Sequence, residues 1–172
     1  MTSPVKPQPL LQRRSLLAWP LLALPLARAQ ALEVGAAAPA LELEGPSGRV
    51  DLAALRGRVV YLDFWASWCA PCRQSFPWMD RMLAQHGPAG LSVVAVNVDR
   101  QRSDADQFLR ALPTRATIAF DGEGATPLRF GVRAMPTSFI IGGDGRVRLH
   151  HRGFKEADTA ELEAALRQAL AR

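Results

Sequence analysis

The sequence predicts an α/β fold with a mixed central sheet and helices on both of its faces, and three observations support this prediction. The nearly continuous apolar runs at residues 59–65 and 91–98 are typical of strands that are buried on both faces. Between residues 70 and 86, apolar side chains recur every three or four positions, which predicts an amphipathic helix. Residues 137–141 and 146–150 flank a Gly/Asp turn and predict a β-hairpin, so part of the sheet is antiparallel.

The other predicted elements complete the order β-α-β-α-β-(α)-β-β-α. Residues 41–44 and 49–50 surround a Gly/Pro-rich turn and predict an N-terminal hairpin, which a helical turn at 51–57 follows. The remaining predictions are a capping box at Ser103 ahead of a helix at 108–112, a strand at 117–120, a brief helix at 125–130, and a C-terminal helix that begins at Glu156 or Asp158.

The first residues have the order of a secretory signal peptide. Lys6, Arg13 and Arg14 precede an apolar run at 16–27, and Ala27-Arg28-Ala29 forms a small-x-small cleavage site. The sequence therefore predicts a signal peptide at 1–29, a flexible lead-in at 30–40 and one globular domain at 41–172.

The export route and the final location have alternatives. The pair Arg13-Arg14, followed after one residue by Leu16-Leu17, resembles a twin-arginine signal, and an ordinary Sec signal is the alternative. An uncleaved membrane anchor is less favoured, because the apolar run is short and contains two prolines. We expect a periplasmic protein.

The charge of the chain does not indicate nucleic-acid binding. Four of the 21 Lys and Arg residues lie in the predicted signal peptide, which leaves 17 basic against 16 acidic residues in the remainder. The high isoelectric point therefore comes mostly from the export signal. We expect a monomer with no nucleic-acid partner.

The only two cysteines, Cys69 and Cys72, lie where the buried run at 59–65 gives way to the predicted helix. Unpaired backbone N–H groups and the helix dipole favour a negative charge at a helix N-terminus, so this position favours the Cys69 thiolate. Because the thiolate is the nucleophile in disulfide exchange, we predict that Cys69 attacks and that Cys72, one turn further on, resolves.

Two structural interpretations of the pair remain as alternatives. A closed zinc site needs four ligands, and the three histidines do not stand at finger-like spacing. A purely structural disulfide across two residues closes a very small loop and removes little chain entropy. A redox-active pair is the favoured interpretation.

The segment from Asp63 to Arg73 resembles the active-site segment of the thioredoxin superfamily, and its Trp-Cys-x-Pro-Cys form is similar to the exported TlpA/ResA-like branch. The resemblance implies a thioredoxin fold in which the first cysteine is the nucleophile and the second resolves the mixed disulfide. The N-terminal hairpin is similar to that of TlpA/ResA-like proteins, and the strand and helix between residues 91 and 120 are similar to their central βα insertion.

The resemblance also assigns residues around the pair. Thioredoxin-fold proteins place a cis-proline at the position of Pro136, which implies that the backbone of Met135 faces the sulfurs and pairs with substrate. Asp63 lies within a buried strand, where desolvation raises its pKa and suits it to exchange a proton with Cys72; an Asp satisfied by backbone or water is the alternative. Trp65 and Trp68 are expected to shield the pair, with Trp68 more exposed and facing partners.

We therefore predict a thiol–disulfide oxidoreductase without a cofactor. The resemblance implies that it reduces disulfides in exported proteins during cytochrome c maturation or copper-site assembly, with electrons from a membrane thiol donor. The alternative function is a soft-metal (copper) binding protein or metallochaperone that uses Cys69 and Cys72 as ligands. A thiol peroxidase is disfavoured, because the Pro-x-x-x-Thr-x-x-Cys pattern is absent.

Overall fold

The computed structural model describes residues 32–172 of the 172-residue chain. The predicted signal peptide at 1–29, with its paired arginines, lies outside the described residues. Within residues 32–172, no helix combines the length and the apolar character needed to cross a membrane.

The protein is built on one mixed sheet of seven strands in the order β2-β1-β5-β4-β3-β6-β7. Strands β3, β4 and β5 are parallel, and all the other neighbouring pairs are antiparallel. This arrangement confirms the predicted mixed sheet and N-terminal hairpin. The strands are β1 Glu42–Gly45, β2 Gly48–Asp51, β3 Val59–Trp65, β4 Leu91–Asn97, β5 Thr117–Phe120, β6 Thr137–Ile141 and β7 Val147–Arg152.

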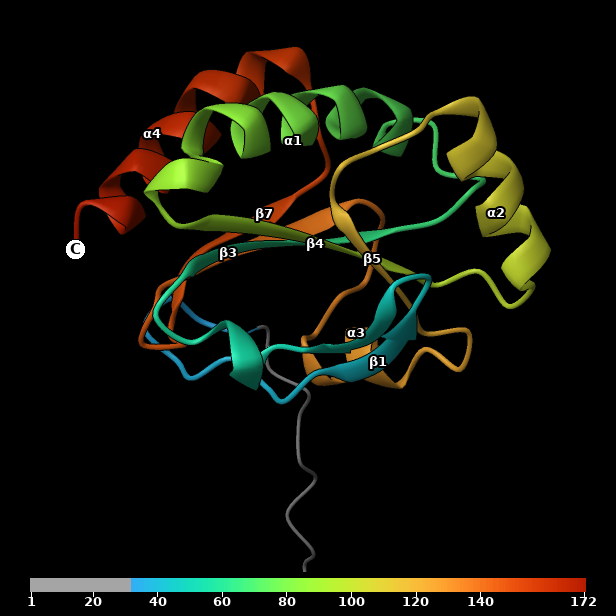
Figure 1. Ribbon diagram of the computed structural model, residues 1–172, viewed down its shortest axis with the longest axis horizontal. Helices are drawn as coiled ribbons and strands as arrows, with labels where there is room; N and C mark the ends of the chain where they lie inside the picture. The colour runs from blue at the N-terminus through green and yellow to red at the C-terminus, as the bar shows by residue number, and fades with distance from the viewer. Residues whose placement is uncertain (1–31) are drawn as a thin grey trace, which may run out of the picture.

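Helices cover both faces of this sheet. Figure 1 shows α1 and α4 side by side on one face, with α3 and the β1 region on the opposite side. The helices are α1 Cys72–His86, α2 Arg102–Ala111, α3 Ala125–Arg129 and α4 Thr159–Leu170. Short 3-10 turns occupy Ala53–Leu55, Gly87–Ala89 and Glu156–Asp158.

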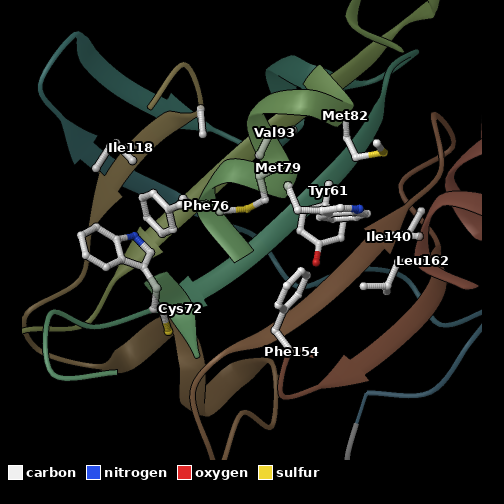
Figure 2. Packing of buried hydrophobic residues seen from close by; sticks show 14 of the residues in the cluster. Tyr61, Cys72, Phe76, Met79, Met82, Val93, Ile118, Ile140, Phe154 and Leu162 are labelled. Carbon is white, nitrogen blue, oxygen red and sulfur yellow. The ribbon is translucent and has the colours of Figure 1, made fainter. Parts of the chain in front are cut away.

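Strand β3 supplies residues to the cores on both faces, because successive side chains of a strand point in opposite directions. Tyr61 and Trp65 pack in the cluster beneath α1 and α4, which also contains both cysteines. Figure 2 shows Cys72, Phe76 and Met79 of α1 within this cluster. Leu62 and Phe64 pack in the second cluster, on the opposite face. The prediction that this strand is buried on both faces is therefore confirmed.

Two predicted helix starts are corrected. Helix α1 begins at Cys72 rather than Ala70, because Pro71 is its N-cap residue. The capping box at Ser103 is wrong: Gln101 is the extended N-cap residue and the helix starts at Arg102, so Ser103 already lies inside its first turn.

Part of the segment expected to be a lead-in, residues 35–38, lies against the sheet. The backbone N–H groups of Gly35 and Ala38 donate to the carbonyls of Val147 and Gly145, at 2.8 and 2.9 Å. The Val147 N–H in turn donates to the Ala36 carbonyl at 2.9 Å. Residues 35–38 therefore pair with the start of β7, because that edge of the sheet has backbone groups free to accept another segment.

The close approach of β1 to β5 gives a test of this fold. A Cβ on Gly45 would lie 2.3 Å from the backbone oxygen of Ile118, so Gly45→Ala should lower the free energy of unfolding by about 1–3 kcal/mol. The matched control is Gly87→Ala, whose Cβ meets only Leu83 at 3.6 Å and whose backbone is already helical. Urea denaturation of both variants measures the difference. Equal stability of the two would contradict the β1–β5 contact.

Candidate active site

The two cysteines form a disulfide at the junction between β3 and α1. Their Cα atoms are 5.3 Å apart, and the Cys72 backbone N–H donates to the Cys69 sulfur at 3.2 Å. Cys69 is 3% exposed and Cys72 is fully buried. The Cys69 sulfur therefore lies at the N-terminus of a 15-residue helix and accepts one of its free N–H groups.

Asp99, just after β4, fixes the loop that leads to Cys69. Its carboxylate accepts hydrogen bonds from the Ser67 backbone N–H at 2.9 Å, the Ser67 hydroxyl at 3.1 Å and the Asn97 side-chain amide at 2.7 Å. The Asp99 carboxylate is buried, and these bonds satisfy it.

The sequence predictions did not assign Asp99 a role, although a signal was present. Asn97 and Asp99 are polar residues directly after a buried apolar strand. The carboxyl ends of parallel strands meet at one edge of a sheet, so polar residues there are candidates to contact the loop after β3.

Trp65 and Trp68 differ in exposure: the first is buried and the second lies at the surface. Trp65 is fully buried and packs against Phe76 and Phe108, with ring centroids 5.0 and 4.7 Å away. Trp68, just before Cys69, is 71% exposed. Only Trp68 is therefore available at the surface beside the disulfide, whereas Trp65 belongs to the core below it.

The Met135–Pro136 peptide bond is cis, as the resemblance to thioredoxin-fold proteins implied. Its loop is held by two hydrogen bonds: Gly153 N–H donates to the Pro136 carbonyl at 2.8 Å, and the Thr137 hydroxyl donates to the Ala134 carbonyl at 2.7 Å. Thr137 pairs with Phe64 of β3, so the loop meets the same end of the sheet as the Cys69 loop.

Asp63 is buried below the disulfide, on the face of β3 that also carries Tyr61 and Trp65. Its cross-strand neighbours are Ala95 on β4 and Ser138 on β6, so neither neighbouring strand supplies a cation. Among the described residues, no donor reaches its Oδ2 atom. Burial therefore raises the pKa of the Asp63 carboxyl well above its ordinary value.

Tyr61 shares this buried environment. Burial is the main cause that raises its pKa, and the Asp63 carboxylate adds to the rise, while a hydrogen bond with Ser138 opposes it. Asp63 thus lies among neutral groups, and its surroundings favour the protonated acid at a pH where an exposed aspartate is ionised.

Across residues 32–172, no three His, Cys, Asp or Glu side chains are grouped so that they could hold a metal ion. The two sulfurs have no third ligand of these types in the part of the chain that the structure describes. Of these four residue types, the described chain therefore offers the alternative copper function only the two thiolates.

Comparison with known proteins agrees with this site. A model of the Redoxin family matches residues 33–166. The chain belongs to the redoxin family. The expected resemblance to ResA-like members is confirmed, because the chain is 29% identical to the thiol-disulfide oxidoreductase ResA of Bacillus thuringiensis subsp. konkukian over 80% of this chain and 79% of ResA.

Two further redoxin-type relatives carry the name DsbE. The thiol:disulfide interchange protein DsbE of Yersinia pestis is 35% identical over 70% of this chain and 64% of its own length. A crystal structure from Chlorobium tepidum, provisionally named DsbE, is 51% identical with a TM-score of 0.80, and the match covers 81% of this chain and 99% of that one. The predicted thioredoxin fold is thereby confirmed.

The buried acid gives a prediction for stability. Between the ordinary aspartate pKa, about 4, and the raised one, the folded protein keeps a proton that the unfolded chain releases. The free energy of unfolding must therefore fall as pH rises through this window. Asp63→Asn should remove this fall and make the protein more stable at neutral pH. Urea titrations at several pH values measure it.

Glu123→Gln is the matched control, because this carboxylate is exposed and its loss should leave the wild-type pH dependence in place. If Asp63→Asn and Glu123→Gln gave the same pH dependence, the account of Asp63 as a buried acid would be wrong.

Proposed function

We propose that this protein is an exported thiol–disulfide oxidoreductase that reduces disulfides in partner proteins. The observation that carries the proposal is the Cys69–Cys72 disulfide at a helix N-terminus, with Cys69 before the helix and Cys72 as its first residue. The two sulfurs therefore differ in position, and the Cys69 sulfur accepts a backbone N–H of the helix, which suits a two-step exchange.

The reaction proceeds in two balanced steps. In the reduced protein, the Cys69 thiolate attacks one sulfur of a partner disulfide, which forms a mixed disulfide and releases the other partner sulfur as a thiolate. The Cys72 thiolate then attacks the Cys69 sulfur, which forms the Cys69–Cys72 disulfide and releases the second partner thiolate. Two electrons pass to the partner, and its thiolates take up two protons.

Asp63 is proposed as the group that accepts the Cys72 proton in the second step. Only the ionised form of Asp63 can accept this proton, and burial, which raises the pKa of Asp63, makes that carboxylate a stronger base. Asp63→Asn should slow this step by about 10²-fold and flatten its pH–rate profile. An unchanged profile would limit Asp63 to a structural role.

Trp68, Met135 and Pro136 are proposed as the surface that docks the partner. Trp68 is exposed beside Cys69, and Met135 is half-buried in the loop that meets the same end of the sheet. An extended partner segment can lie along this loop and present its sulfur to Cys69. In a trapped mixed disulfide, the partner should shield Trp68 from solvent, which its fluorescence reports.

The proposed compartment rests on the signal-like order of residues 1–29, and the proposed electron source and clients rest on the resemblance to TlpA/ResA-like proteins. We propose a periplasmic location, a membrane thiol donor, and clients in cytochrome c maturation or copper-site assembly. As a reductant, the protein should be mostly oxidised when it equilibrates with a glutathione buffer. A pair that stays reduced there would reverse the proposed direction of electron flow.

Two serine substitutions test the assignment of the sulfurs. Cys69→Ser should abolish reduction of insulin disulfides, because the attacking thiolate is lost. Cys72→Ser should still attack but not resolve, so mixed disulfides with partners should accumulate and be visible on non-reducing gels. Full activity of the Cys69→Ser protein would contradict the proposed chemistry.

The trapped partners also test the proposed client. Mass spectrometry of the Cys72→Ser adducts should find precursors of cytochromes c or of copper proteins. If the Cys72→Ser protein captured neither class while the wild-type protein still reduced insulin, the client proposal would be wrong and the proposed chemistry would stand.

A further inference from the structure

Four exposed arginines lie in the chain segments around the disulfide. Arg73 directly follows Cys72, Arg100 follows the Asp99 that holds the Cys69 loop, and Arg133 lies two residues before Met135. Arg152 pairs with Thr137, next to Pro136. These four residues, here called the arginine rim, come from four different elements or loops.

The topology explains why the four meet around one site. Strands β3 and β4 are parallel and end at Trp65 and Asn97, so Arg73 and Arg100 follow strand ends at the same edge. Strand β6 is antiparallel to β3 and therefore begins at this edge, and β7 ends there. Arg100 and Arg133 thus flank the Cys69 loop on opposite sides.

Among the described residues, the charge of the arginine rim is not neutralised by ion pairs. None of its four residues forms an ion pair within residues 32–172, whereas Arg49, Arg102, Arg148 and Arg167 do. Asp99 lies close by, but its carboxylate is buried and already accepts three hydrogen bonds.

The exposed acids at this end belong to the outer elements. Glu123 follows β5, two strands away from β3, and Glu156 follows β7. Asp104 lies in the first turn of α2 and lines a shallow surface depression together with Ser67 and Arg73. The Asp104 carboxylate thus lies near Arg73. In the part of the chain that the structure describes, neither Glu123 nor Glu156 forms an ion pair with Arg100 or Arg133.

This asymmetry does not follow from the total charge. The chain beyond residue 29 holds 17 basic and 16 acidic residues and is nearly neutral as a whole. Four of these basic residues lie around the disulfide, where Asp99 is buried and Asp104 lies near Arg73. A local field of one sign attracts partners of the opposite sign and raises their association rate by about 10–10³-fold.

We propose that the arginine rim selects partner proteins whose disulfide is flanked by acidic residues. This inference deepens the proposed function and rests on it. Trp68 and Met135 make the apolar contact with the partner, and the arginine rim determines which partners bind. Aspartate or glutamate beside the partner cysteines would pair with Arg100 and Arg133 as the partner segment lies across Cys69.

The test compares three synthetic peptides that contain the same internal disulfide, flanked by Asp, Gln or Lys residues. Stopped-flow tryptophan fluorescence gives the second-order rate constant for the reduced protein with each peptide. At low salt, the Asp peptide should react at least about 10-fold faster than the Lys peptide. In about 0.5 M salt, where charges are screened over a few ångströms, the rates should converge.

Charge reversal locates the effect. The double variant Arg100→Glu, Arg133→Glu should lower the ratio of the Asp-peptide rate to the Lys-peptide rate by about 10-fold or more. The matched control is Arg172→Glu, because Arg172 is exposed at the opposite end of the sheet, beside Gly57 and Gly90 where β3 and β4 begin. This control should keep the wild-type ratio.

The outcomes separate this inference from the proposed function. Equal rates for the three peptides, a faster Lys peptide, or a ratio that salt leaves unchanged would overturn the arginine rim as a selector. If the wild-type protein reduced neither the peptides nor insulin, the proposed function itself would fail. The salt series needs only the wild-type protein, so it decides the matter even if the double variant does not fold.

Discussion

The pairing of β3 with β4 on one side and with β6 on the other is the constraint on which the site depends. Strand β3 carries Asp63 and leads into the loop of Cys69. The register with β4 brings Asp99 to Ser67, and the register with β6 brings Pro136 to the same end of the sheet. Residues far apart in the chain thus meet because β4 and β6 each pair with β3 in a fixed register.

The two sulfurs differ because they occupy different positions relative to helix α1. Cys69 stands before the first turn of α1, where a free backbone N–H already points to its sulfur, and the arginine rim adds positive charge on the surface around it. Cys72 is enclosed in the core with Phe76 and Met79. In the reduced protein, these features should favour the thiolate at Cys69, and we propose that a nearby group takes the proton of Cys72.

The features that local chemistry determines could be predicted from the sequence. The apolar run of β3 and the spacing of Cys69 and Cys72 each carry a signal within a few residues, and the structure has the strand and the disulfide there. The cis bond before Pro136 was implied by the resemblance to thioredoxin-fold proteins, and the structure has it. Features that depend on distant partners could not. Asp99 acts through Ser67, the pairing of residues 35–38 depends on the free edge beside β7, and the burial of Trp65 depends on Phe108 of α2. The start of α2 was missed because Ser103 has the signature of a cap, while the chain enters the helix two residues earlier through Gln101.

The inequality of the two sulfurs is the central claim, and selective alkylation of the reduced protein tests it most directly. Iodoacetamide is added over a range of pH, and mass spectrometry reports the modification of each cysteine separately. The account predicts that Cys69 reacts first, with a pH midpoint below the ordinary thiol pKa of about 8.5, and that Cys72 reacts slowly until the protein is unfolded. Equal reactivity of the two cysteines, or faster modification of Cys72, would contradict it.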